Sequence, residues 1–233
     1  MKILLKWLYL KSLTEKNYQI TKKHPAPCTH IFADKAGHIV NANQVSIVEY
    51  IKNRISIKQR PLEIKKCERF GDLEVDLIIG KNHEQAIVTI NDRASGMLKM
   101  KKIPSKEAKV VQKTITELLE DWIPYILTMT SDNGKEFAEH QTLAKKSYID
   151  YYFAHPYHSW KRGSNENLNE LIRQYIPKRT AFKTISDHYV KDIETKLNKR
   201  PRKRFNYESP IFEMEKLLFN QKLNLWLEFG ILY

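Results

Sequence analysis

The segment Leu73 to Ile79 (LEVDLII) constrains the fold more than any other part of the chain. It is a short apolar run between two glycines, which is the pattern of a buried strand. Asp76 lies in its middle, and a carboxylate in a buried strand is costly unless something pairs with it. We therefore expect either a functional site at Asp76 or an edge strand whose wetter face carries Glu74, Asp76 and Ile78.

Further strands and helices follow in a regular order. Apolar runs bounded by turn residues predict strands, and apolar residues repeating at helical spacing predict helices. The expected strands are 85–90, 96–103, 125–130 and 148–154, and the expected helices are 105–120, capped by Ser105, and 135–146. The order is thus three strands, a helix, a strand, a helix and a strand, followed by a polar loop and a third helix.

A second acid, Asp132, follows the predicted strand 125–130 in the sequence Ser-Asp-Asn-Gly. The carboxyl end of a strand is where an open α/β sheet places functional groups, and Gly134 would allow a tight turn into the next helix. Turn chemistry with a helix cap is the alternative interpretation of Asp132. Asp92 also lies at a strand end, but a turn role explains it fully, and we leave it out of the candidate acids.

A third acid, Glu166, lies in the segment Trp160 to Pro177 (WKRGSNENLNELIRQYIP). This segment is typical of a loop that leads into a helix capped by Ser164 or Asn165. An apolar stripe at helical spacing would be buried, and it comprises Leu168, Leu171, Ile172 and Tyr175. A second face carries Glu166, Asn169 and Arg173. It suits contact with metal and phosphate, or it is a solvated face with a capping acid.

The three acids indicate a chemistry. Ligand sets made only of oxygen select a hard cation such as Mg²⁺, for which Mn²⁺ can substitute. Two such ions held by shared carboxylates support in-line phosphoryl transfer. The chain has no Walker A sequence, which argues against a P-loop nucleotidase.

Charge points to a polyanionic partner. The 233 residues include 40 Lys and Arg against 27 Asp and Glu, a net charge of +13. Residues 178–204 carry ten basic and three acidic side chains, and such a patch can bind a nucleic-acid backbone. The two cysteines lack metal-site spacing, which fits an intracellular, cytoplasmic setting. No stretch approaches the roughly 18 apolar residues of a membrane span.

Four stretches of the chain resemble the DDE transposases of bacterial insertion sequences, and among these the family named after insertion sequence thirty. They are GDLEVDLIIG, TSDNGKEF, YFAHPYHSWKRGSNENLNELIRQYIPK and LNKRPRKRFNYESP, within roughly residues 54–212. The resemblance implies an α/β, ribonuclease-H-like core of the retroviral integrase type, with a mixed five-stranded sheet flanked by helices. The family's acidic triad falls on Asp76, Asp132 and Glu166, with 33 residues between the last two.

The resemblance also implies a function. It is metal-dependent cleavage and strand transfer of an insertion sequence, with two Mg²⁺ ions on the triad, and thus DNA recombination and integration. The partners would be the element ends, the target DNA and further copies of the chain in a homo-oligomer near the bacterial nucleoid. The candidate DNA contacts are Trp160, Lys161, Arg162, Asn165, Asn169, Arg173, Lys178 and Arg179. Trp160 could instead pack under its loop, and Asn165, Asn169 and Arg173 could instead touch groups around the metals.

Two features depart from the family pattern. Leu73 and Val75 stand where the family often has Trp and Gly, and residues 1–53 do not resemble its N-terminal helix-turn-helix region. We expect an appendage at 1–60, truncated or aberrant, a catalytic core at 61–212 and a C-terminal helix at 213–233. The alternatives are a catalytically idle DNA-binding remnant that regulates a full-length transposase, and a general ribonuclease-H or resolvase nuclease.

Overall fold

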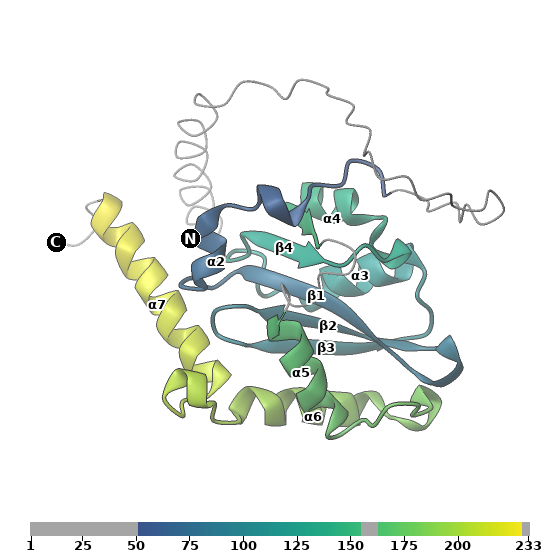
Figure 1. Cartoon of the computed structure of the whole chain (residues 1–233). Coiled ribbons are helices and arrows are strands. Elements are labelled where there is room, and N and C mark those ends of the chain that lie inside the picture. Colours follow the sequence, from purple (N-terminus) through teal and green to yellow (C-terminus); the bar gives the residue numbers. More distant parts are fainter. Residues whose placement is uncertain (1–50, 155–162, 230–233) are drawn as a thin grey trace, which may run out of the picture. The chain divides into compact units, whose positions relative to one another are not determined.

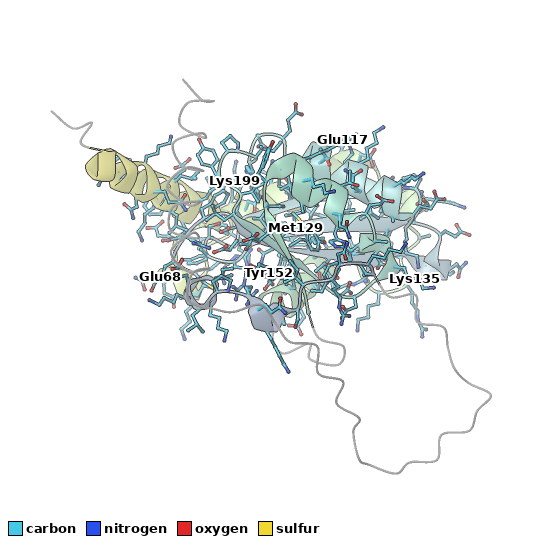
Figure 2. All side chains as sticks on the ribbon, turned by 90° about the horizontal axis from the view of Figure 1, so that it is seen from above. Glu68, Glu117, Met129, Lys135, Tyr152 and Lys199 are labelled. Atoms are coloured by element: carbon cyan, nitrogen blue, oxygen red, sulfur yellow. The ribbon has the colours of Figure 1, made fainter. Side chains whose placement is uncertain are left out.

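The computed structural model describes residues 51–154 and 163–229, except for the side chains of His83, Gly163, Ser164, Glu166 and residues 224–229. The described residues belong to one compact unit that starts at Ile51 (Figure 1). Figure 2 shows Met129 in the middle of this unit, whereas charged side chains such as Glu117 and Lys135 lie toward its periphery. No described helix is both long enough and apolar enough to cross a bilayer.

A five-stranded sheet forms the centre of the unit. Its strands are β1 (Asp72–Ile79), β2 (Ala86–Asp92), β3 (Leu98–Ile103), β4 (Thr128–Ser131) and β5 (Asp150–Phe153), in the order β3-β2-β1-β4-β5. The pairs β1–β2 and β2–β3 are antiparallel, whereas β1–β4 and β4–β5 are parallel. The prediction of a mixed five-stranded sheet flanked by helices is therefore confirmed. The edge-strand interpretation of Asp76 is wrong, because β1 is the central strand.

Helices cover both faces of this sheet (Figure 1). The α-helices are α2 (Leu62–Lys66), α3 (Ala108–Leu118), α4 (His140–Ser147), α5 (Gly163–Arg173), α6 (Asp187–Lys199) and α7 (Pro210–Phe229). Single turns of 3₁₀-helix lie at η1 (Ile57–Gln59), η2 (Lys81–His83), η3 (Lys135–Phe137), η5 (Phe182–Thr184) and η6 (Lys203–Phe205). The long α7 corresponds to the predicted C-terminal helix.

Several predicted boundaries were wrong for local reasons. The helix expected from residue 105 begins at Ala108, and its N-cap is Glu107 rather than Ser105. The strand expected from residue 125 starts at Thr128, because the amide of Tyr125 still donates to Trp122 O at 2.8 Å in a turn. The strand expected from residue 148 starts at Asp150, because Tyr148 ends α4 in the left-handed conformation with φ 53°.

Alternation along the strands divides the core into two clusters. Successive strand residues point to opposite faces. On one face Leu73, Val75 and Met129 pack under Val111 and Ile115 of α3. On the other face four buried side chains of the sheet pack under α5 and α6. They are Ile78, Ile87, Leu98 and Met100. Full burial of one such side chain stabilises the fold by about 1.5–3 kcal/mol, so both faces hold the sheet in place.

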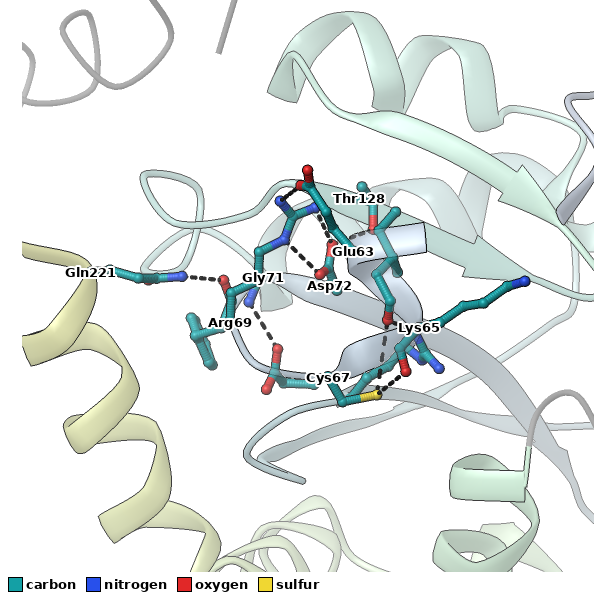
Figure 3. A network of polar contacts seen from close by, with 12 residues as sticks. Glu63, Lys65, Cys67, Arg69, Gly71, Asp72, Thr128 and Gln221 are labelled. Atoms are coloured by element: carbon teal, nitrogen blue, oxygen red, sulfur yellow. Dashed lines mark hydrogen bonds and ion pairs between the residues drawn. The ribbon is translucent and has the colours of Figure 1, made fainter. Parts of the chain in front are cut away.

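The second face also contains a buried polar network at the start of β1, shown in Figure 3. Asp72 and Glu74 are each only 1% exposed, which contradicts the prediction that Glu74 lies on a wet face. Arg69 Nε lies 2.8 Å from Asp72 Oδ2, and Thr128 Oγ donates to Asp72 Oδ1 at 2.8 Å. Arg93 Nε lies 2.9 Å from Glu74 Oε1. Buried carboxylates are tolerated when paired in this way, and the Asp72 contacts tie β1 to β4.

Candidate active site

Asp76 lies within β1, and Asp132 directly follows the neighbouring parallel strand β4. In the β1–β4 register Glu74 is opposite Thr130, and each acid follows two residues later. Residues two apart in extended chain share a face, and adjacent strands lie about 4.8 Å apart. Extension of this register by two residues would place Asp76 beside Asp132, just beyond the carboxyl end of β4, at the edge where open α/β sheets place ligand-binding groups.

Asp132 shapes the turn that follows β4. Its Oδ1 accepts the amide of Gly134 at 3.0 Å, and its backbone oxygen accepts Ser131 Oγ at 2.8 Å. The turn interpretation is thus confirmed, whereas the helix-cap interpretation is wrong, because Gly134 is the N-cap residue of η3. The Gly134 amide takes one of the about four lone-pair positions that a carboxylate offers.

Gly134 is not required for backbone freedom. Its φ of −64° is accessible to any residue, so the expected tight glycine turn does not explain it. A Cβ at this position would lie 2.4 Å from the carboxyl carbon of Glu136, at the end of a flexible side chain that can turn away. The continuous helix predicted for 135–146 is also wrong: η3 ends at Phe137, and α4 begins at His140.

The carboxylate of Asp76 is half-buried and joins β1 to α5. Its Oδ1 accepts the amide of Leu77 at 3.0 Å, and its Oδ2 accepts Nδ2 of Asn169 at 3.0 Å. Asn169 lies on α5 three residues after Glu166, and residues at this spacing share a helix face. The backbone of Glu166 therefore lies on the side of α5 that meets the end of β1.

The first turn of α5 contains Glu166, as predicted. The helix begins at Gly163, so Ser164 and Asn165 lie inside it and the prediction that either caps it is wrong. The predicted apolar stripe is confirmed: Leu168 and Ile172 are buried, and the partly buried Leu171 and Tyr175 pack against the same cluster.

An open groove of about 600 Å³ adjoins Asp76. Its lining comes from β1 and from α5 with the following loop: Leu77, Ile78, Asn169, Glu170, Arg173, Gln174 and Lys178. Two cations face it. Nη1 of Arg173 donates to Pro177 O at 3.3 Å. Burial lowers the pKa of Arg173, but a guanidinium stays protonated at neutral pH. The groove is therefore suited to an anionic ligand close to the strand ends.

The other predicted DNA contacts differ in accessibility. Asn165 is 4% exposed, and this burial does not support the predicted surface contact with DNA. Lys178 and Arg179 are both exposed. Trp160, Lys161 and Arg162 lie outside the described residues, as does the side chain of Glu166.

The described side chains include no group of three His, Cys, Asp or Glu residues that could hold a metal ion. The predicted metal site depends on the carboxylate of Glu166, which is not among them. The triad therefore stays a prediction, with Asp76 on β1 and Asp132 directly after the adjacent strand β4. All of these ligand atoms are oxygens, which are the donors that Mg²⁺ and Mn²⁺ accept.

One contact to the Asp132 turn was missed from the sequence. Nη1 of Arg54 donates to Oδ1 of Asn133 at 2.6 Å. Arg54 lies at the start of the stretch that resembles the transposase family, but no motif there gave it a role. Its partner is 79 residues away in the sequence, and a separation of this size leaves no local signal.

Comparison with known proteins finds similar chains among transposases. No model of a protein family matches the chain. The transposase for insertion sequence element IS4351 of Bacteroides fragilis is 51% identical over 172 residues, which are 74% of this chain and 52% of that protein. The transposase for IS1086 of Cupriavidus metallidurans is 34% identical over 73% of this chain and 50% of its own length. Transposase InsI for IS30A of Escherichia coli is 32% identical over 69% of this chain and 42% of its own length. The chain spans about half the length of these curated relatives.

Proposed function

Because the chain belongs to the IS30 family of insertion-sequence transposases, we propose that its core catalyses DNA strand cleavage and strand transfer. We assign the five-stranded sheet with its flanking helices to the ribonuclease-H-like class of the retroviral integrase type. The observation that supports the proposal is the parallel β1–β4 pairing that ends at Glu74 and Thr130, each two residues before one of the acids, beside a groove with cationic side chains.

Three carboxylates would hold the metal. Asp76 and Asp132 would contribute from the strand ends and Glu166 from α5. Their oxygen donors fit two Mg²⁺ ions, which Mn²⁺ can replace. When bound, such a pair activates an attacking oxygen and stabilises the leaving oxygen of an in-line displacement.

The side chains around the acids orient them and hold the DNA. Asn169 fixes the direction of the Asp76 carboxylate by donating to Oδ2. Arg173 and Lys178 line the groove and would bind phosphates of the DNA backbone, which positions the strand without reading its sequence. Trp160, Lys161, Arg162 and Arg179 remain proposed contacts.

The proposed reaction has two steps, cleavage and strand transfer. In cleavage, water attacks a phosphodiester at the element end, the bond to the 3′ oxygen breaks, and a 3′-hydroxyl and a 5′-phosphate result. In strand transfer, that 3′-hydroxyl attacks a phosphodiester of the target DNA, and the displaced strand leaves with its own 3′-hydroxyl. Two element ends must meet for this outcome, so we propose that the active species contains more than one copy of the chain.

A plasmid assay tests the proposal. Supercoiled DNA that carries the ends of an insertion sequence of this family is incubated with the full chain and Mn²⁺. We expect nicking by the wild type and none by Asp132→Asn, with DNA affinity changed by no more than a few-fold. Asp121→Asn, which alters an exposed acid paired with Lys99, is the matched control and should nick normally.

Undiminished nicking by Asp132→Asn would remove the acid from the mechanism. A wild type that binds DNA with a steep salt dependence but never cuts it would favour the idle DNA-binding remnant. Cleavage of RNA–DNA hybrids without strand joining would favour a general ribonuclease-H nuclease.

A further inference from the structure

The segment 52–56 lies along the outer edge of β5. Ser56 forms a parallel bridge with Phe153, and the amide of Phe153 donates to Ile55 O at 2.9 Å. Gln141 of α4 donates to Lys52 O at 3.0 Å, and Figure 1 shows the segment passing this helix. Backbone contacts on two elements therefore fix the path of the segment.

The residues that follow this segment also contact the core. The side chain of Ile57 is buried, and the buried Arg60 donates through Nη1 to Oγ1 of Thr130 at 3.3 Å. Thr130 belongs to β4, two residues before Asp132. The segment is thus held against both strands that end near the Asp132 turn, and Arg54 lies between these anchors.

Arg54 reaches from this segment to the turn itself. Its Nη1 donates to Oδ1 of Asn133 at 2.6 Å, and Nδ2 of Asn133 donates to the carbonyl of Ala154 at the end of β5. The side-chain amide of Asn133 therefore forms hydrogen bonds through both its oxygen and its nitrogen. Asn133 lies between Asp132 and Gly134, the residues joined by the Oδ1–amide contact of 3.0 Å.

We propose that Arg54 is a positioning residue for Asp132, acting through Asn133. It contacts no reacting group, and it restricts the turn that sets the direction of the Asp132 carboxylate. Its importance for catalysis rests on the proposed function, whereas its effect on the turn does not. The contact lies at the surface, where solvent screens a charged hydrogen bond, so we expect effects of about two- to five-fold.

Exchange of backbone amides with deuterium tests the effect on the turn directly. The full chain is compared with Arg54→Ala and Arg54→Lys, without metal or DNA. We expect faster exchange of the Gly134 amide in Arg54→Ala by about two- to five-fold, because opening of the turn becomes easier. Arg54→Lys should restore part of the protection. Lys58→Ala removes an exposed cation four residues further along the chain, in η1, and should leave the exchange unchanged.

A double-mutant comparison tests the route through Asn133. Asn133→Ala alone should speed Gly134 exchange, and adding Arg54→Ala should change it little further, because both substitutions break the same contact. In the nicking assay Arg54→Ala should raise the Mn²⁺ concentration for half-maximal rate by about two- to five-fold, with DNA affinity within two-fold of wild type.

Unchanged exchange at Gly134 in Arg54→Ala would overturn the proposal. Weaker DNA binding with unchanged exchange would instead make Arg54 a phosphate contact, which also overturns it. If the wild type cuts no DNA, the proposed function fails, but the exchange comparison still decides the role of Arg54.

Discussion

Asp92 connects the residue before β1 to the turn between β2 and β3. Its Oδ1 accepts the Gly71 amide at 2.8 Å, and its Oδ2 accepts the amide and the hydroxyl of Ser95, each at 2.7 Å. The side chain is fully buried. Burial raises the pKa of Asp92 from 3.8 to about 6, although the hydrogen bonds from Ser95 and Gly71 act in the opposite direction.

The folded protein therefore binds a proton at Asp92 more tightly than the unfolded chain does. Stability falls with rising pH wherever the folded state binds more protons. The contribution of Asp92 should thus be greatest below about pH 4 and decline until about pH 6, above which both states are ionised. A shift from 3.8 to about 6 corresponds to a loss of about 3 kcal/mol.

Urea unfolding followed by circular dichroism, between about pH 4 and pH 7, measures this loss. Asp92→Asn cannot titrate and isolates the contribution from that of every other group. We expect the stability of the wild type relative to Asp92→Asn to fall by about 2.5 kcal/mol over this range, because part of the loss already occurs below about pH 4. A constant difference would refute the raised pKa. A difference that grows with pH would show that the hydrogen bonds outweigh burial.

Three further substitutions probe the site and its support. Asn169→Ala should slow Mn²⁺-dependent nicking about ten-fold or more, because Asp76 loses a charge-assisted hydrogen bond worth about 1.5–3 kcal/mol. Asn167→Ala, at an exposed position of the same helix, is the control. Nicking by Asn169→Ala at the wild-type rate would contradict the orienting role. Gly71→Ala should lower the free energy of unfolding by at least about 2 kcal/mol, since φ is +107° and the Cβ would lie 2.0 Å from Tyr125 O; a change below about 0.5 kcal/mol in urea unfolding would contradict this. Lys178→Ala should weaken binding to all DNA sequences alike and reduce the salt slope by about 1, as measured by fluorescence anisotropy; a sequence-dependent loss would argue against a phosphate contact.

The sheet and the helix of the third acid were predictable because their signals are local. The apolar run from Leu73 to Ile79 corresponds to β1, and the stripe through Leu168 and Ile172 corresponds to the buried face of α5. Both patterns repeat with the period of the element that they form. The positions of Asp76 and Asp132 relative to these runs could therefore be stated before any coordinates.

Long-range pairing was not predictable in this way. The alternation of β1 places Glu74 and Asp76 on one face, but it does not reveal that Glu74 is buried and paired with Arg93. The contact between Arg54 and Asn133 likewise joins two segments that share no sequence pattern. Sequence patterns also misplaced strand boundaries where the chain changes direction. At Tyr148, for example, the left-handed backbone conformation makes β5 begin only at Asp150.

The central claim is that Asp76, Asp132 and Glu166 share divalent cations. Anomalous diffraction from crystals grown with Mn²⁺ locates bound manganese directly. The account predicts anomalous peaks coordinated jointly by Asp76 and Asp132, with the Glu166 carboxylate completing the site. Manganese bound only elsewhere, or the two strand-end carboxylates turned away from any common ion, would contradict it.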